Sequence, residues 1–200
     1  MGSPLILASG STARQMLLKN AGLDFVAITA TVDERAIEDN LPLAGRDPVS
    51  VARHLAVAKA MDVSARAPGA FVIGCDQTMS LGGNRIFHKA ASMDEARQTL
   101  ITLRGKAHFL NSAVCLVRDG ELLWSDVTKA CMQVRDFSEK YLDGYLARNG
   151  DSILSSVGCY QLEGEGVQLF DAIAGDYFTI LGLPLLPLLG ALREHEINHA

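Results

Sequence analysis

The sequence lacks an uninterrupted apolar segment long enough to cross a membrane. Its start shows no positively charged stretch followed by an apolar one, which is the pattern of a secretory leader. The longest apolar stretch, residues 180–192, is interrupted by glycines and prolines, whereas a spanning helix needs roughly 20 mostly apolar residues. We therefore expect a cytoplasmic protein that has no membrane partner.

The sequence also lacks an excess of basic residues. Eighteen Lys and Arg residues stand against twenty-three Asp and Glu residues, which gives a net charge of −5 near neutral pH. Proteins that bind nucleic acids through their phosphates need a basic surface, so this balance argues against a nucleic-acid partner. Any anionic ligand would have to meet a local group of basic side chains.

Cysteine is scarce and widely spaced in this chain. The four cysteines, at positions 75, 115, 131 and 159, form no C-x-x-C pair. Because closely spaced pairs are the usual zinc signature, and disulfide frameworks belong to secreted proteins, neither kind of site is indicated. We expect the cysteines to be small residues of the core.

The length and composition that remain are those of an ordinary globular protein. Two hundred residues, 48% of them hydrophobic, suffice for a core, and no internal repeat or low-complexity linker divides them. We expect a single domain over residues 1–200. Strand-like segments alternate with helical patterns, and Asp119-Gly120 predicts a hairpin between two long strands. The predicted fold class is therefore α/β with a mixed central sheet.

A short apolar segment near the middle of the chain ends on an acidic residue. Residues 71–73 follow the breaker pair Pro68-Gly69, which favours a buried strand over a helix. Asp76 is predicted where this strand meets its loop, the edge at which ligands bind in open α/β sheets. A carboxylate there is placed to hold a metal or to accept a proton, although a lone aspartate after a strand is more often a turn or cap residue.

The first strand segment, residues 5–8, runs into a loop of small residues and then a helical pattern closed by Gly22. Such a loop directs backbone N–H groups and the hydroxyls of Ser9 and Ser11 to a helix N-terminus, where Arg14 adds a positive charge. A phosphate fits this arrangement. The GxxxxGK[ST] spacing of a Walker loop is absent, and serines before a helix are often only caps, so both interpretations stay open.

The next segments supply further charged candidates. Residues 25–31 have the composition of a second strand, and residues 32–35 follow as a polar loop whose two acids either contact a ligand or are solvated. Asp47 is predicted to cap a helix. On that helix Lys59 lies at the edge of the buried stripe, where its ammonium is expected to reach water or an anion.

A capping box marks the start of the next helix. Ser92 and Glu95 have the S-x-x-E spacing, and the apolar pattern continues until Gly105. Lys89 lies just upstream in a loop, where a solvated lysine is the simplest interpretation. The neighbouring His88 is a weak candidate proton carrier, because no partner for it is visible in the sequence.

The C-terminal half contains the last predicted elements. Ser138 is predicted to cap a helix that ends near Gly150. A stretch punctuated by glycines, residues 155–166, allows close approach to a ligand, although ordinary turns use glycine equally. It precedes a strand predicted over residues 167–173, and a final helix is predicted from about Pro184.

Several motifs spread along the chain occur in an order that resembles one protein family. They are Ser9-Gly10-Ser11-Thr12-Ala13-Arg14, Asp33-Glu34, Lys59-Ala60, Gly74-Cys75-Asp76-Gln77, His88-Lys89, Gly158-Cys159-Tyr160 with Glu163-Gly164, Gly175-Asp176-Tyr177 and Gly182-Leu183-Pro184-Leu185. Together they resemble the Maf family of nucleoside triphosphate pyrophosphatases over nearly the whole chain. The resemblance implies an elongated α/β fold of two lobes around a cleft, similar in plan to inosine triphosphate pyrophosphatases, and a homodimer.

The resemblance also implies a role for single residues. It makes Asp76 the proton acceptor, with Lys59 and Lys89 as the other catalytic residues. The loop contacts to the nucleotide fall on Ser9, Ser11, Arg14 and Glu34.

A nucleoside triphosphate carries about four negative charges, which Arg14, Lys59 and Lys89 would offset together with Mg²⁺ or Mn²⁺ as a divalent metal cofactor. Asp76 then either deprotonates the attacking water or holds the metal that acidifies it.

The chain departs from the family's usual motifs at positions that bear on specificity and rate. Where Ser-Pro-x-Arg-Arg is usual, it has Ser11-Thr12-Ala13-Arg14-Gln15, and His88-Lys89-Ala90 replaces Gly-Lys-Pro. Gln77 and Glu163 stand where many members carry threonine and glutamine, as in the branch associated with 7-methyl-GTP. Ala13, Gln77 and Glu163 are therefore the residues expected to set substrate specificity.

The function implied is hydrolysis of non-standard or modified nucleoside triphosphates, 7-methyl-GTP among them, to the monophosphate and pyrophosphate. The alternative is a weakly catalytic nucleotide-binding regulator of cell division, which would keep the basic residues without needing Asp76. A structural α/β domain would leave these groups scattered over the surface.

Overall fold

The computed structural model describes residues 3–42, 45–83 and 85–197. The chain divides into two compact units. Unit 1 consists of Met1–Gln77, Asn111–Thr128 and Tyr177–Ala200, and unit 2 consists of Thr78–Leu110 and Lys129–Asp176. Three long strands contribute residues to both units, so the boundaries after Gln77, Leu110 and Thr128 fall within strands, whereas the boundary after Asp176 does not.

The described residues form a seven-stranded sheet in the order β2-β1-β3-β5-β6-β7, with β4 paired to β3 beside this path. The strands are β1 (Leu5–Leu7), β2 (Val26–Ala27), β3 (Phe71–Leu81), β4 (Arg85–Phe87), β5 (Ala107–Arg118), β6 (Glu121–Val134) and β7 (Phe170–Ala174). β1 runs parallel to β2 and β3, whereas β4 is antiparallel to β3 and β7 is antiparallel to β6. The predicted mixed α/β class is confirmed.

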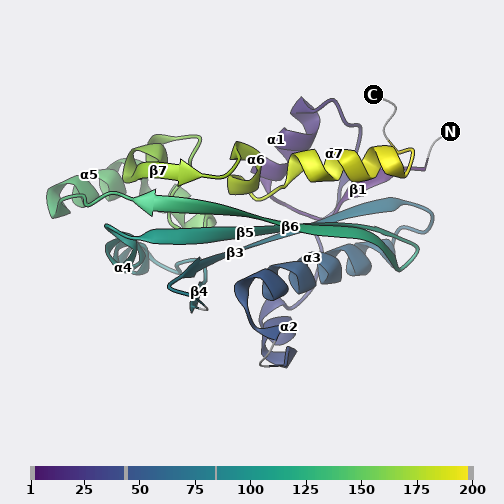
Figure 1. Ribbon diagram of the computed structural model, residues 1–200, viewed down its shortest axis with the longest axis horizontal. Coiled ribbons are helices and arrows are strands. Elements are labelled where there is room, and N and C mark those ends of the chain that lie inside the picture. The colour runs from purple at the N-terminus through teal and green to yellow at the C-terminus, as the bar shows by residue number, and fades with distance from the viewer. Residues whose placement is uncertain (1–2, 43–44, 84, 198–200) are drawn as a thin grey trace. The chain divides into compact units, whose positions relative to one another are not determined.

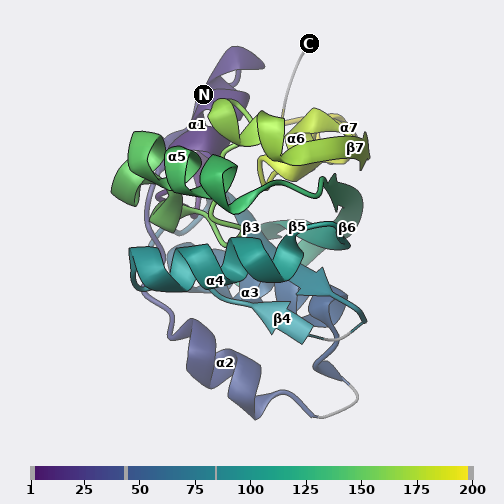
Figure 2. The same cartoon turned by 90° about the vertical axis from the view of Figure 1, so that its left-hand side faces the viewer.

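The helices of unit 1 are α1 (Thr12–Asn20), α2 (Glu34–Asn40), α3 (Pro48–Ser64), α6 (Tyr177–Ile180) and α7 (Leu185–Glu194). Those of unit 2 are α4 (Met93–Leu103), α5 (Glu139–Asn149) and the 3₁₀ helices η2 (Gly150–Ser155) and η3 (Glu165–Leu169). Figure 2 shows α4, α5 and β4 of unit 2. In the part of the chain that the structure describes, no helix has the length and apolar character that crossing a bilayer requires.

Two hydrophobic cores lie on opposite faces of the unit 1 strands. α1 and α7 cover one face and α3 covers the other (Figure 1). Successive side chains of a strand point to opposite faces, so Leu5 and Leu7 join the core under α1 and α7, while Ile6 joins the core under α3. The cysteines at 75, 115 and 159 are buried and free, as predicted for core residues, whereas Cys131 is half-buried.

The packing of α3 against β3 depends on a glycine. A Cβ added at Gly74 would lie 2.2 Å from the carbonyl oxygen of Ala56 and 2.8 Å from the Cβ of Ala60. Only glycine therefore permits this close approach. Asp76 follows Gly74 by two positions on the same face of β3, and Lys59 follows Ala56 by three on the same side of α3, so the close packing brings Lys59 to Asp76.

The prediction that Asp76 ends a strand was wrong. β3 continues to Leu81, and its last residues pair with β4 in the register Met79–Phe87 to Leu81–Arg85. The continuation contains Thr78 and Ser80, two small polar residues that are buried and have bonding partners. A strand can bury such residues when their polar groups are satisfied, so polarity alone did not mark the strand end.

The segment between β1 and α3 also differs from the prediction. Only Val26–Ala27 of the predicted strand over residues 25–31 pairs as a strand. Farther on, the Thr31 N–H donates to the Asp62 carboxylate at 3.0 Å, so a side chain of α3 and not a neighbouring strand satisfies it. The predicted polar loop over residues 32–35 contains instead the Asp33 cap and the first turn of α2, which begins at Glu34.

Several predictions of turns and caps are confirmed. Asp119 and Gly120 form the hairpin turn with φ of 49° and 77°. Ser92 accepts from the Glu95 N–H at 3.2 Å, although the Glu95 carboxylate bonds the N–H of Ala91 and not that of Ser92. The strand predicted over residues 167–173 is wrong in its first half, because η3 occupies Glu165–Leu169 and β7 begins only at Phe170.

Candidate active site

A buried carboxylate on β3 is the centre of the candidate site. Asp76 retains 6% exposure, and its Oδ1 lies 2.5 Å from Nζ of Lys59 on α3. The same ammonium lies 2.7 Å from Oε1 of Glu34, at the start of α2. The two carboxylates differ in environment, since the side chain of Glu34 is 55% exposed and that of Asp76 is 9% exposed. One lysine thus bridges an interior acid and a surface acid.

Burial and charge act in opposite directions on this pair. Burial raises the pKa of Asp76, and the positive charges of Lys59 and Arg14 only partly oppose that effect. Burial alone would lower the pKa of Lys59, but the charge of Asp76 and the hydrogen bonds to Asp76 and Glu34 raise it. Lys59 therefore stays protonated near neutral pH, while Asp76 is a stronger base than an exposed aspartate.

The loop between β1 and α1 is held together by its own side chains. The Ser11 hydroxyl caps α1 by accepting from the Arg14 N–H at 3.4 Å. The Ser9 hydroxyl accepts from the Ser11 N–H at 3.2 Å and from Nη1 of Arg14 at 3.4 Å. Ser11 is thus a helix cap in this structure, and the contacts of both serines with a nucleotide stay a prediction.

The guanidinium of Arg14 reaches the backbone of two distant segments of unit 1. Its Nε donates to the carbonyl of Gly182 at 2.8 Å, and its Nη1 donates to the carbonyl of Cys75 at 3.1 Å. Cys75 directly precedes Asp76 on β3. The structure therefore brings Arg14 to the same stretch of β3 as Lys59.

Gln77 is anchored through its side-chain nitrogen. Its Nε2 donates to the Ser112 hydroxyl at 2.8 Å and to the carbonyls of Thr179 at 3.0 Å and Ile180 at 3.2 Å. These contacts turn the amide nitrogen toward the protein, which leaves the amide oxygen as the atom available to a ligand. The sequence analysis did not identify Ser112. Its position within an apolar segment of a predicted strand was a usable signal, because a buried hydroxyl needs a hydrogen-bond partner.

Three predicted site residues remain, namely Ala13, Lys89 and Glu163. Ala13 is half-buried in the first turn of α1 in unit 1. Lys89 and Glu163 belong to unit 2 and are exposed, Lys89 after β4 and Glu163 before η3. The roles of these three residues stay predictions.

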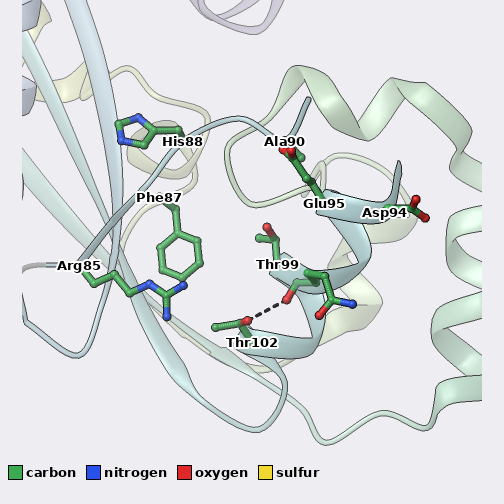
Figure 3. Close-up of a pocket in the computed structure, with 9 residues that line it drawn as sticks. Arg85, Phe87, His88, Ala90, Asp94, Glu95, Thr99 and Thr102 are labelled. Carbon is green, nitrogen blue, oxygen red and sulfur yellow. Dashed lines mark hydrogen bonds between the residues drawn. The ribbon is translucent and has the colours of Figure 1, made fainter. Parts of the chain in front are cut away.

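Unit 2 has a cavity of about 350 Å³ of its own, between β4 and α4 (Figure 3). Its lining consists of Arg85, Phe87, His88, Ala90, Asp94, Glu95, Gln98, Thr99 and Thr102. The Arg85 guanidinium lies 4.8 Å from the centre of the Phe87 ring, which faces the α4 side chains, while the His88 ring points away from α4. His88, the weak candidate proton carrier, belongs to this lining, whereas none of the residues that the family resemblance makes catalytic or specificity-determining does.

The described residues contain no cluster of three or more His, Cys, Asp or Glu side chains arranged to hold a metal ion. Among the predicted residues, Asp76 is the carboxylate that is buried. Mg²⁺ is usually bound by one or two carboxylates together with waters and substrate phosphates, so a single aspartate fits this mode of binding.

The profile of the Maf-like protein family matches residues 4–195. The chain belongs to the Maf-like protein family. A 7-methyl-GTP pyrophosphatase of Rhizobium etli is 57% identical to this Maf-like chain over 194 residues, 97% of each protein. Another of Brucella abortus is 55% identical over 192 residues, 96% of each. A nucleoside triphosphate pyrophosphatase of Caulobacter vibrioides is 53% identical over 193 residues, 96% of each. The predicted family resemblance is confirmed.

Proposed function

We propose that this Maf-like chain is a hydrolase that cleaves nucleoside triphosphates to the monophosphate and pyrophosphate, with 7-methyl-GTP among its substrates. The observation that carries the proposal is the buried Asp76 carboxylate 2.5 Å from the Lys59 ammonium. It is supported by relatives of the same length that are named for this activity. A regulator that only bound nucleotides would not need an acid of raised pKa between basic residues.

In this proposal Asp76 accepts the proton of the attacking water. A general base works best when its pKa approaches the working pH, and burial moves Asp76 in that direction. Lys59 holds the carboxylate in place through its hydrogen bond and offers its charge to the phosphates. Glu34 is the more exposed partner of Lys59, so it is the carboxylate that an arriving phosphate displaces.

Asp76 is also the residue that would hold a divalent cation, Mg²⁺ or Mn²⁺, together with the phosphates of the substrate. Such a cation would offset phosphate charge and acidify a bound water. Arg14 contributes a fixed positive charge beside the same strand. Lys89 is proposed to be the third positively charged side chain that meets the phosphates, because it matches the lysine of the family motif.

Base selection is proposed to depend on Glu163. Guanine presents two adjacent N–H donors on its Watson–Crick edge, and one carboxylate can accept both. Methylation at N7 adds positive charge to the ring, which strengthens attraction to a carboxylate. Gln77 would contribute its amide oxygen. The family resemblance further supports a homodimer, and the protein is also proposed to be cytoplasmic.

The direct test is release of pyrophosphate from a panel of nucleotides, with and without divalent metal. We expect 7-methyl-GTP to yield equal amounts of monophosphate and pyrophosphate, and the rate to depend on Mg²⁺ or Mn²⁺. Production of the diphosphate and inorganic phosphate would refute the bond assignment. Tight nucleotide binding without turnover would favour the regulator instead.

A further inference from the structure

The turn that ends α6 is built around a glycine with a left-handed backbone. Gly182 has φ of +87°, its N–H donates to the Thr179 carbonyl at 3.0 Å, and the next N–H, of Leu183, donates to the Phe178 carbonyl at 3.1 Å. This pair of hydrogen bonds is the Schellman motif, which ends helices at a glycine. The turn directs the carbonyl of Gly182 to Arg14, whose Nε donates to it at 2.8 Å.

The same glycine leaves little room beside the Arg14 side chain. A Cβ at position 182 would lie 3.1 Å from Nη2 and 3.2 Å from Nε of Arg14. The guanidinium cannot yield without cost, because its Nη1 is also bonded to the carbonyl of Cys75 at 3.1 Å. A side chain at 182 would therefore strain or break the contacts that fix Arg14 beside β3.

The end of α6 also bonds the side chain of Gln77, the residue that follows Asp76 on β3. The Thr179 and Ile180 carbonyls accept from Nε2 of Gln77. The residues before and after Asp76 are thus both connected to this turn, Cys75 through Arg14 and Gln77 directly.

We propose that Gly182 is a positioning residue for Arg14, holding the guanidinium in the orientation in which it meets the phosphates of the substrate. The inference rests on the proposed function. Gly182 touches no reacting atom in this account. It acts by accepting from Nε of Arg14 and by leaving space that any larger residue would fill.

The chain contains a matched control in Gly22, which ends α1. Its N–H donates to the Lys19 carbonyl at 3.0 Å, and the Leu23 N–H donates to the Leu18 carbonyl at 3.1 Å, so the motif is the same. Its φ is +76°, and a Cβ there would meet nothing within 4 Å. Gly22→Ala therefore carries a similar backbone penalty to Gly182→Ala without affecting Arg14.

The test compares kcat/KM for 7-methyl-GTP in the wild type, Gly182→Ala, Gly22→Ala, Arg14→Ala and the double variant Gly182→Ala with Arg14→Ala. Small misplacement of a positioning group costs on the order of 10- to 100-fold in rate, so we expect Gly182→Ala to lose that much relative to Gly22→Ala. In the Arg14→Ala background the further loss should vanish, because there is no guanidinium left to displace.

The inference is overturned if Gly182→Ala loses no more activity than Gly22→Ala, or if its loss persists without the guanidinium. Arg14→Lys tests the same idea should Gly182→Ala fail to fold, since lysine keeps the charge but not the fork that reaches two carbonyls. We expect it to be nearly as inactive as Arg14→Ala, and wild-type activity would overturn the inference. Full activity of Arg14→Ala would overturn it too, whereas a wild type that releases no pyrophosphate refutes the proposed function itself.

Discussion

His108 makes the folded protein sensitive to acid. It is fully buried in unit 2, with Nε2 2.7 Å from the Tyr160 hydroxyl, and its Nδ1 has no hydrogen-bond partner among the described residues. Burial lowers the pKa of His108 from its ordinary 6.5 to about 4. Between those values the unfolded chain binds a proton that the folded chain does not. The contribution of neutral His108 to the unfolding free energy is therefore fully present above about pH 6.5 and is lost as the pH falls toward 4.

The size of this effect follows from the difference in pKa. A change of one pKa unit corresponds to about 1.4 kcal/mol, so the fall from 6.5 to about 4 amounts to about 3 kcal/mol of unfolding free energy. His108→Gln keeps a group able to bond Tyr160 but does not titrate. We expect the wild type to lose about 3 kcal/mol more than this variant between about pH 7 and about pH 4.

Urea denaturation at a series of pH values measures the difference directly. His54→Gln provides the control for replacing a histidine by glutamine, because His54 is exposed and not buried. Titrating carboxylates contribute equally to all three proteins and cancel in the comparison. If His108→Gln loses as much stability with acid as the wild type does, His108 is not held neutral by burial and the reasoning fails.

Three further results are expected. Gly74→Ala should cost on the order of 3 kcal/mol, since its Cβ would lie 2.2 Å from the Ala56 carbonyl oxygen, and an unchanged melting temperature would contradict the packing described. Lys89→Ala should lower kcat/KM for triphosphates while changing stability by less than about 0.5 kcal/mol, because Lys89 is exposed; a melting temperature that falls in step with activity would show a structural role. Glu163→Gln should reduce the preference for 7-methyl-GTP over UTP, measured as a ratio of kcat/KM values, and an unaltered ratio would exclude Glu163 from base selection.

The features that the sequence predicted well depend on neighbouring residues. The hairpin turn at Asp119-Gly120 requires only that both residues adopt a positive φ. The Ser92 cap requires only that its hydroxyl accept a hydrogen bond from the N–H three residues later. α2 was missed because none of its residues is buried, so it has no apolar period to detect.

The features that could not be predicted depend on distant residues. The bond from Arg14 to Gly182 joins positions 168 apart, and no local pattern announces it. The length of β3 was underestimated because the partners of its buried polar residues are set by the tertiary fold. Lys59 was placed correctly at the edge of the buried stripe, but its pairing with both Asp76 and Glu34 required the close packing at Gly74.

The proposed hydrolysis depends on Asp76 above all, and replacing its carboxylate by an amide tests this role most directly. Single-turnover hydrolysis of 7-methyl-GTP at saturating nucleotide should be measured for the wild type, Asp76→Asn and the control Asp171→Asn, an exposed aspartate of β7. The amide keeps the shape of the carboxylate and an oxygen for the Lys59 ammonium, so nucleotide binding should persist in Asp76→Asn. It cannot accept a proton or bind a cation as an anion, so the chemical step should slow by at least about 100-fold, with Asp171→Asn unaffected. A wild-type rate in Asp76→Asn would contradict the account.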